Sequence, residues 1–358
     1  MSPPFFTIPN INNLRDASLN ISGLPTTNPP GKIRPGILFR SADVSKLDLE
    51  GWNAVRSIGV GHVFDLRSRP EVEKGWKVVT QTRDGGNEKG GGDGADDDVR
   101  PPWLSTMEAS GVKRTWTPVF SAEDYSPERL AERYLKYMDE SAEGFVMAYQ
   151  DILLNAGPAF RTIFSYLTQV GPVGNGNEEG EAKGALIHCT AGKDRTGIFF
   201  GILFDYLGVE RRLIADEYQL TELGLAHIRE EVVARLMQSP AFKNYVMSEK
   251  EGGDATPTTA QVAELFKRVV DVPVASPTSP SGANGVSESE PEAEIPPEVL
   301  EKGRQAALRM IGAKKESMLG ALEMVDREFG GSEGYLRRVV GFGDAELEML
   351  KRNLVVGA

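Results

Sequence analysis

The residue with the clearest chemical potential is Cys189, the only cysteine among 358 residues. Arg195 follows it with the spacing Cys-x5-Arg, and Gly192 lies midway between the two. A thiolate is a strong nucleophile, and a guanidinium binds two oxygens of a phosphate at once. This pattern predicts a site that binds an oxyanion and attacks it with sulfur.

The segments on either side of this loop are apolar. Residues 185–188 are expected to form a short strand that ends at His188, and a strongly apolar helix is expected from about Thr196 to Gly208. A strand, a tight loop and a helix in this order direct backbone N–H groups toward a bound anion. The positive field of the loop also favours the thiolate form of Cys189 over the thiol.

The neighbours of the cysteine have separate expected roles. Arg195 is expected to hold two phosphate oxygens and to stabilise charge in the transition state. Lys193 is expected to add a cation at the mouth of the site, while Thr196 donates its hydroxyl to the sulfur and His188 orders the loop. Gly192 lets the backbone approach the phosphate without a Cβ in the way. The residues expected to contact phosphate are Thr190, Ala191, Gly192, Lys193, Thr196 and Gly197.

The leaving oxygen needs a proton, and two aspartates are candidates for the general acid. Asp194 lies in the loop itself and is preferred, because it requires no assumption about which strands are neighbours. Asp65 lies at the carboxyl end of another predicted strand, and such ends usually face the same crevice of a parallel sheet. The alternative role for Asp65 is an ion pair with Arg67 or Arg69 that fixes its loop.

The upstream pattern favours an α/β fold. Residues 37–40 and 63–66 are predicted to be strands with a helix over 48–58 between them, and strand–helix–strand order is typical of parallel pairing. The fold class is therefore α/β, with a mostly parallel central sheet, flanking helices and loop insertions. Further helices are expected from Ser126, over 145–154, over 159–167, over about 299–325, and from Asp344.

Two stretches have a composition that does not suit a packed core. Residues 80–101 contain mostly glycine and polar or acidic side chains, and residues 250–297 are rich in Ser, Pro and Glu, above all over 276–297. We interpret the first as a low-complexity insert and the second as a linker or insert. The chain is otherwise expected to form a single domain over residues 1–355, completed by C-terminal helices within 298–355.

Composition argues against several classes of protein. The formal net charge is −12, unlike a surface that binds nucleic acid. A single cysteine is incompatible with a disulfide scaffold or a thiolate-rich zinc site, and His62, His188 and His227 lack the spacing of metal ligands. Neither a secretory signal nor an apolar run of membrane-spanning length is visible, so a cytoplasmic location is expected. No cofactor or metal ion is expected, and the sequence does not indicate an oligomeric state.

The sequence also resembles the tyrosine phosphatase family that includes bacterial secreted tyrosine/lipid phosphatases and fungal homologues. Residues 188–197 match the family pattern His-Cys-x-x-Gly-Lys-Asp-Arg-Thr-Gly at every fixed position. The resemblance covers most of residues 5–75, 103–245 and 298–355. Other matching segments are Asn-Asn-Leu-Arg-Asp at 12–16, Leu-Phe-Arg-Ser at 38–41, Asp-Leu-Arg-Ser at 65–68 with Glu71, and Gly-Tyr-Leu at 334–336.

The resemblance implies a cysteine-phosphatase α/β fold and metal-independent hydrolysis through a phosphocysteine intermediate. It also implies phosphotyrosine, phosphoserine or phosphothreonine, and phosphoinositides as substrates. The chain has no Trp-Pro-Asp sequence, which supports Asp194 as the acid. Three hypotheses stay open: a protein-tyrosine or dual-specificity phosphatase, a phosphoinositide phosphatase, and a phosphate-binding protein without turnover. A wide basic mouth would favour the lipid, and its candidate residues are Lys32, Arg34, Arg40, Lys193, Arg211 and Arg212.

Overall fold

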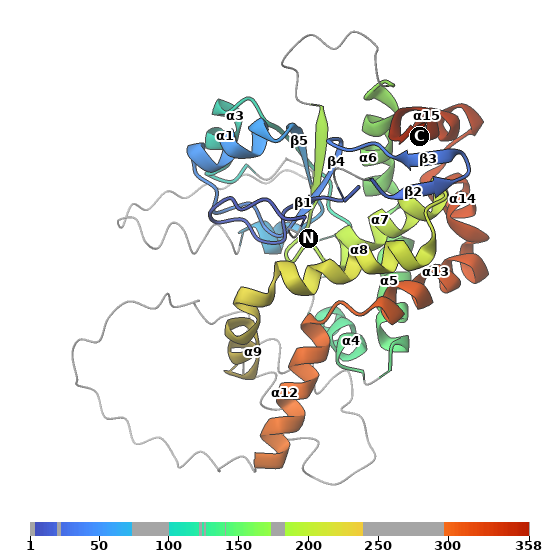
Figure 1. Cartoon of the computed structure of the whole chain (residues 1–358). Helices are drawn as coiled ribbons and strands as arrows, with labels where there is room; N and C mark the ends of the chain where they lie inside the picture. The colour runs from blue at the N-terminus through green and yellow to red at the C-terminus, as the bar shows by residue number, and fades with distance from the viewer. Residues whose placement is uncertain are drawn as a thin grey trace. The chain divides into compact units, whose positions relative to one another are not determined.

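The computed structural model describes residues 4–19, 23–73, 100–121, 124, 127–139, 141–172, 183–238 and 297–357 (Figure 1). Most of the two expected inserts, 80–101 and 250–297, lies outside these residues, so both inserts stay predictions, as does the single domain. The chain divides into two compact units. The first comprises Met1–Asp124, Ser141–Ile228 and Gly312–Ala358, and the second comprises Tyr125–Glu140 and Arg229–Ile311.

A five-stranded sheet lies at the centre of the first unit. Its order is β1-β4-β7-β5-β6, with the last four strands parallel and β1 antiparallel at one edge. The expected mostly parallel sheet is therefore confirmed. The strands are β1 (Arg15–Asp16), β4 (Leu38–Ser41), β7 (Gly184–His188), β5 (Val60–Asp65) and β6 (Lys113–Trp116). A smaller antiparallel sheet contains β2 (Pro25–Thr27), β3 (Pro30–Ile33) and β8 (Val355–Val356).

The strand register brings three chain segments to one end of the central sheet. His188, the last residue of β7, pairs with Ser41 of β4 on one side and with Asp65 of β5 on the other. Because these strands are parallel, the segments that follow them leave the sheet at the same end. The cysteine loop therefore emerges between the segments that follow β4 and β5.

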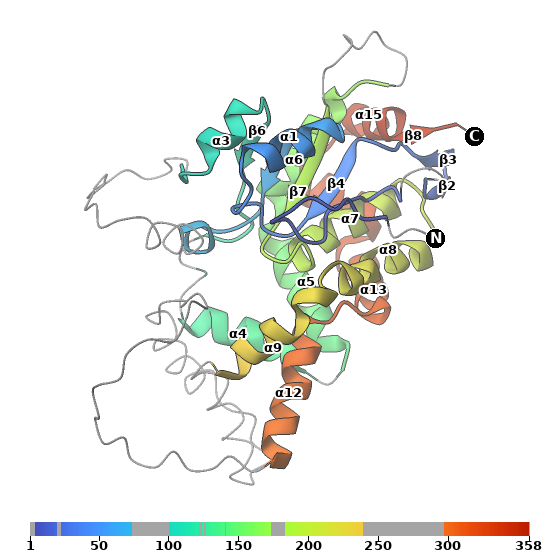
Figure 2. The same ribbon diagram turned by 60° about the vertical axis from the view of Figure 1, so that its left-hand side comes forward.

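Helices lie on both sides of the sheet (Figures 1 and 2). On one side are α1 (Leu49–Ser57) and α3 (Leu104–Ala109), and on the other are α6 (Gly157–Gln169) and α7 (Asp194–Tyr206). Most of α7 is buried, as its apolar sequence predicts. The first unit also contains α5 (Glu143–Asn155), α8 (Arg211–Gly224), α13 (Lys315–Phe329), α14 (Gly331–Tyr335) and α15 (Asp344–Leu354), with helical turns at Ala226–Ile228 and Leu336–Val340.

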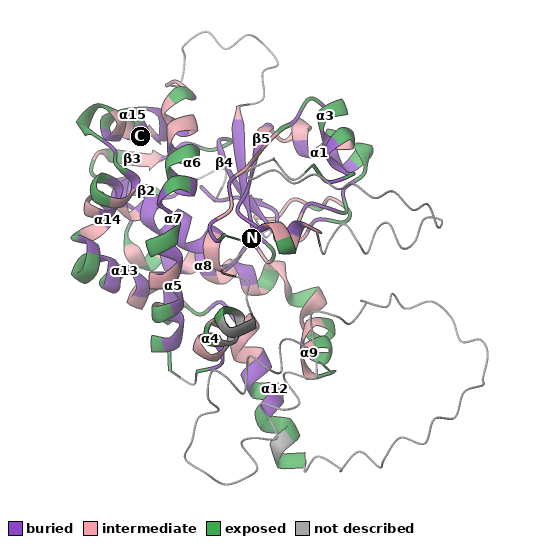
Figure 3. Ribbon diagram, turned by 180° about the vertical axis from the view of Figure 1, so that it is seen from behind, coloured by how far each residue is buried: buried purple, intermediate pink, exposed green. Residues whose placement is uncertain are grey.

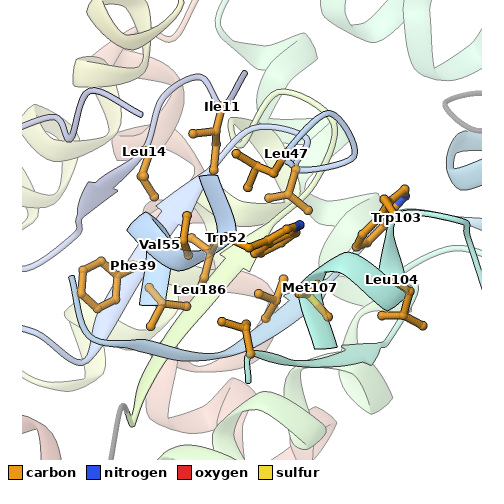
Figure 4. Packing of buried hydrophobic residues seen from close by; sticks show 14 residues of the cluster. Ile11, Leu14, Phe39, Leu47, Trp52, Val55, Trp103, Leu104, Met107 and Leu186 are labelled. Atoms are coloured by element: carbon orange, nitrogen blue, oxygen red, sulfur yellow. The ribbon is translucent and has the colours of Figure 1, made fainter. Parts of the chain in front are cut away.

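The face of the sheet beneath α1 and α3 carries a distinct apolar cluster (Figure 4). Trp52 of α1 stacks on Trp103 with 6.2 Å between the ring centroids, and Phe39 and Leu186 reach the cluster from neighbouring strands. Figure 3 shows the wider pattern, in which the central strands β4 and β7 are buried and many helices expose one face. The side chain of Asp48 caps α1 by accepting the Gly51 N–H at 2.8 Å, so the helix begins where the sequence predicts.

The second unit consists, among the described residues, of α4 (Pro127–Met138), α9 (Arg229–Gln238) and α12 (Pro297–Ile311). The three helices meet through Met138, Val233, Ala306 and Ala307.

The prediction of one helix over about 299–325 is wrong. The chain leaves α12 after Ile311 and begins α13 at Lys315. Gly312 is a poor helix former, and the N–H of Ala313 donates to the Glu222 carboxylate at 2.9 Å instead of continuing a helical ladder.

His62 of β5 lies among aromatic rings. Its ring centroid is 4.6 Å from that of Phe64 and 5.0 Å from that of Tyr166, and its Nε2 shares a 2.7 Å hydrogen bond with the Thr115 hydroxyl. Burial, with a smaller contribution from Lys113, lowers the pKa of His62 from 6.5 to about 4.

The lowered pKa of His62 predicts that the stability of the fold depends on pH. Between pH 6.5 and about 4 the unfolded chain binds a proton at His62 that the folded chain excludes, so stability falls as the pH falls through this window. His62→Phe keeps the aromatic packing and removes the proton. Between about pH 7 and about pH 4.5, the free energy of unfolding of this variant should fall less than that of wild type. The two decreases should differ by at most about 2 kcal/mol, because the partial exposure of the ring limits the effect. Urea unfolding at both pH values measures the difference, and identical pH dependence would contradict this account.

Candidate active site

The predicted loop connects the end of β7 to the start of α7. Cys189 is the first residue after the strand and is 2% exposed, so it lies at the base of the loop. The helix begins two residues earlier than expected, so Asp194 and Arg195 belong to its first turn. The positive end of the α7 dipole is therefore at the loop and favours negative charge there.

Backbone groups of neighbouring segments hold two of the loop carbonyls. The His188 carbonyl accepts the N–H of Leu66, which follows β5, and the Thr190 carbonyl accepts the N–H of Asp43, which follows β4. Both distances are 3.0 Å. The two strands that flank β7 therefore continue into segments that grip the loop from either side.

Side chains hold the next two carbonyls. The Asn13 amide donates to the carbonyls of Ala191 and Gly192, at 3.2 and 3.3 Å. The Arg40 guanidinium donates to the Gly192 carbonyl at 2.7 Å. Both donors come from near the N-terminus and are buried.

These contacts determine where the loop N–H groups point. In a trans peptide the N–H points away from the carbonyl of the preceding residue. Donors outside the loop hold the carbonyls of residues 188 and 190–192, so the N–H groups of residues 189 and 191–193 are turned to its inner side. Converging N–H groups of this kind form an anion-binding nest.

Gly192 is required by both conformation and space. Its φ is 63°, which disfavours other L residues, and an added Cβ would lie 2.1 Å from the Ser41 carbonyl oxygen. The loop backbone is therefore pressed directly against the end of β4.

Arg195 is oriented by Glu71, a residue for which no role was predicted from the sequence. Its two terminal nitrogens bind the two carboxylate oxygens of Glu71, each at 2.6 Å. Glu71 also accepts the hydroxyl of Thr190 at 2.6 Å and the N–H of Ser68 at 3.0 Å. Only its place in the family pattern, six residues after Asp65, marked it in the sequence.

The carboxylate of Asp194 is 22% exposed and is held through one oxygen. The Tyr149 hydroxyl donates to Oδ1 at 3.3 Å, and the Lys193 ammonium lies 3.5 Å from the same atom. The Tyr149 hydroxyl also forms a hydrogen bond with the buried hydroxyl of Tyr218. Burial, and then the charge of Asp194, raises the pKa of Tyr218, so this hydroxyl stays protonated.

Lys193 does not lie at the mouth of the site as expected. It is 3% exposed, its ammonium donates to the Gly312 carbonyl at 3.1 Å, and the same group lies 5.0 Å from the centre of the Phe145 ring. Three of the other five candidates for the basic mouth are also engaged elsewhere, whereas Lys32 is half-buried and Arg212 is exposed. Arg40 is fully buried, Arg34 donates to the carbonyls of Gly171 and Asn353, and Arg211 pairs with Asp205 and Asp326.

Asp65 is fully buried and forms the ion pair considered as its alternative role. Arg67 binds both carboxylate oxygens at 2.9 Å, and Arg114 adds a contact of 3.0 Å. Burial alone would raise the pKa of Asp65, but Arg67, His188 and Arg114 together hold it well below its usual range. Asp65 is therefore ionised near neutral pH and has no proton to donate.

His188 and Thr196 are also buried. Burial lowers the pKa of His188, and its Nδ1 lies 3.2 Å from the Cys189 carbonyl oxygen. The ordering role of His188 stays a prediction. The Thr196 hydroxyl has no hydrogen-bond partner among the described residues. The expected bond from Thr196 to the sulfur is therefore not formed in this structure. Gly197 lies against Tyr218, where an added Cβ would be 2.9 Å from the ring.

Among the described residues, no helix is long and apolar enough to cross a bilayer. Among the same residues, no group of three or more His, Cys, Asp or Glu side chains is placed to hold a metal ion.

Gly192 gives a direct test of the loop geometry. Gly192→Ala should displace the loop, because the added Cβ would clash with the Ser41 carbonyl oxygen. Binding of inorganic phosphate should then weaken by at least about tenfold, which is a loss of about 1.4 kcal/mol of binding free energy. Protection of Cys189 from iodoacetamide by phosphate measures this binding. Gly36→Ala is the matched control, since Gly36 also has a positive φ, 76°, but open space around its Cβ position. Equal phosphate protection in the two variants would show that the clash with β4 is unimportant.

Comparison with known proteins agrees with this geometry. The model of the tyrosine phosphatase family matches residues 6–356. The triple specificity protein phosphatase PtpB of Mycobacterium tuberculosis is 27% identical over 214 residues, which are 58% of this chain and 68% of that protein. A tyrosine-protein phosphatase of Nostoc commune is 33% identical over 184 residues, which are 51% of this chain and 47% of that protein. The chain therefore belongs to the tyrosine phosphatase family, whose members are enzymes that hydrolyse phosphate esters.

Proposed function

We propose that this protein hydrolyses phosphotyrosine in proteins, with phosphoserine and phosphothreonine as further substrates, through a phosphocysteine intermediate. One observation carries the proposal: outside donors hold four carbonyls of the loop that contains the only cysteine, so its N–H groups face inward. The nest, the α7 N-terminus and Arg195 together supply the positive charge that a phosphate dianion requires.

In the first proposed step, the Cys189 thiolate attacks phosphorus. The sulfur–phosphorus bond forms while the bond from phosphorus to the leaving oxygen breaks. Loop N–H groups and Arg195 stabilise the charge on the equatorial oxygens. Asp194 donates its proton to the leaving oxygen, which departs as a neutral hydroxyl. Asp65 does not serve as the acid, because it is buried and ionised.

In the second proposed step, water attacks the phosphocysteine. The Asp194 carboxylate takes a proton from the water, the sulfur–phosphorus bond breaks, and inorganic phosphate and the Cys189 thiolate are released. Thr196 lies in the first turn of α7 with a buried hydroxyl that lacks a partner among the described residues. We assign this hydroxyl the role of donating to the departing sulfur.

The geometry favours phosphotyrosine over a phosphoinositide. Cys189 is 2% exposed, and a long phosphotyrosine side chain reaches a nucleophile at the base of a loop more readily than a short phosphoserine or phosphothreonine side chain does. A polyphosphorylated head group would call for several exposed cations, whereas Lys193 and Arg40 are buried. The printed name of the mycobacterial relative assigns triple specificity to that protein.

The first test is phosphate release in EDTA by wild type and by Cys189→Ser. Wild type should hydrolyse a phosphotyrosine peptide faster than phosphoserine peptides or phosphoinositides. Cys189→Ser should lose more than about 1,000-fold in kcat, as expected for removal of a nucleophile. Faster release from phosphoinositides would replace the proposed substrate. A folded wild type that binds phosphate without releasing it from any substrate would support the phosphate-binding alternative.

The role of Asp194 predicts a dependence on the leaving group. Asp194→Asn should lower kcat by about 100-fold on a phosphotyrosine peptide, because the amide cannot donate the proton. On an aryl phosphate with a strongly acidic leaving group, which departs without protonation, the loss should be much smaller. Asp205→Asn, near the other end of α7, is the control for general effects on the helix. Equal losses on both substrates would remove Asp194 from the role of acid.

A further inference from the structure

Three charged side chains are buried together beside the loop. Arg15 of β1 and Arg40 of β4 are 0% exposed, and Glu217 of α8 is 1% exposed. Glu217 bridges the two arginines: its Oε1 accepts from Arg15 Nε at 2.7 Å, and its Oε2 accepts from an Arg40 terminal nitrogen at 2.6 Å. Removing three charges from water is costly, and a buried ion pair is weak evidence of a contribution to stability. This cluster therefore calls for another explanation.

One arm of the cluster reaches the loop directly. While one terminal nitrogen of Arg40 binds Glu217, the other donates to the Gly192 carbonyl at 2.7 Å. The carboxylate thus fixes the guanidinium plane, and the plane fixes the direction of the second donor.

The other arm acts through an amide. Arg15 donates to the side-chain oxygen of Asn13, and the amide nitrogen of Asn13 donates to the carbonyls of Ala191 and Gly192 at 3.2 and 3.3 Å. Because a guanidinium can only donate, the group that it contacts must be the amide oxygen. This contact sets the amide orientation and turns the nitrogen toward the loop.

The two arms converge on the same carbonyl, that of Gly192. We propose that Glu217 is a positioning residue that sets the anion-binding conformation of the phosphate loop, through Arg40 on one side and through Arg15 and Asn13 on the other. The proposal rests on the proposed function of the loop. It gives Glu217 an effect on the thiolate and on phosphate binding without any contact with either.

A purely electrostatic role makes the opposite prediction. Burial lowers the pKa of Arg15 to about 10, so Arg15 remains charged at neutral pH and the cluster carries one net positive charge. Glu217→Gln would raise this to two positive charges. If only charge mattered, the variant would hold the Cys189 thiolate more firmly. If positioning matters, the glutamine NH2 faces a guanidinium, one arm loses its acceptor, and the thiolate becomes less favourable.

The test uses the full chain and follows alkylation of Cys189 by iodoacetamide as a function of pH, with and without inorganic phosphate. The label reports on this site alone, because the chain has no other cysteine. In Glu217→Gln the midpoint of the profile should rise by about one pH unit, as expected for the loss of one well-aimed hydrogen bond. Protection by phosphate should weaken at least about tenfold. A misplaced loop should lower kcat/KM by about 100-fold.

Asp16→Asn is the matched control. Asp16 is 3% exposed and accepts hydrogen bonds from Ser18 and Gly36, not from the loop. The Asp16→Asn variant should be less stable than wild type but should keep the alkylation profile of wild type. In folded Glu217→Gln, a midpoint that stays in place or falls would overturn the proposal.

A second variant covers the case in which Glu217→Gln does not fold. Asn13→Ala keeps all three buried charges and removes the two donors to the loop, so its midpoint should also rise, and an unchanged profile would overturn the proposal. Failure of the proposed function remains distinguishable from failure of this proposal. If wild type releases no phosphate from any substrate, the enzymatic proposal fails, while the alkylation profiles still decide the role of Glu217.

Discussion

Backbone N–H groups can bind an anion only when the carbonyls of the same peptides have other partners. Each peptide carries a donor and an acceptor that point in opposite directions, so an inward ring of donors requires an outward ring of acceptors. Here the outer partners are the N–H groups of Leu66 and Asp43 and the side chains of Asn13 and Arg40. Much of the surrounding fold, from the parallel strand order to the placement of the N-terminal segment, brings these donors to one loop.

The sequence predicted the parts of the site that have local signals. The Cys-x5-Arg spacing, the apolar strand before it and the apolar helix after it lie within one short segment, and Asp48 marked the start of α1. Side-chain direction had no such signal: Lys193 faces Gly312 rather than the mouth. Glu217 was missed because an acid on an amphipathic helix usually faces solvent, and its partner Arg15 lies 202 residues away. Gly312 alone did not reveal that the pattern over 299–325 contains two helices.

Two buried ionic networks flank the cysteine loop, and they support different parts of it. Asp65 with Arg67 and Arg114 lies at the end of β5, next to the strand that precedes Cys189. Glu217 with Arg15 and Arg40 lies on the side of β4 and α8. Apolar replacements of such networks often preserve stability but lose directed donors. Direction is what an anion site needs, and the network of Glu217 supplies directed donors to the loop through Arg40 and Asn13.

The spread of these partners along the chain has a consequence for biosynthesis. A chain made from its N-terminus contains the proposed nucleophile once Cys189 is added, but Glu217 of α8 comes later and the Gly312 carbonyl that binds Lys193 much later. Contacts between such distant residues form late, because long segments must first be ordered. Cys189 is therefore synthesised before its loop can take its final shape. A ribosome-bound chain that ends before α8 carries the sulfur but lacks Glu217, so the loop can take the conformation proposed for anion binding only after α8 has been made.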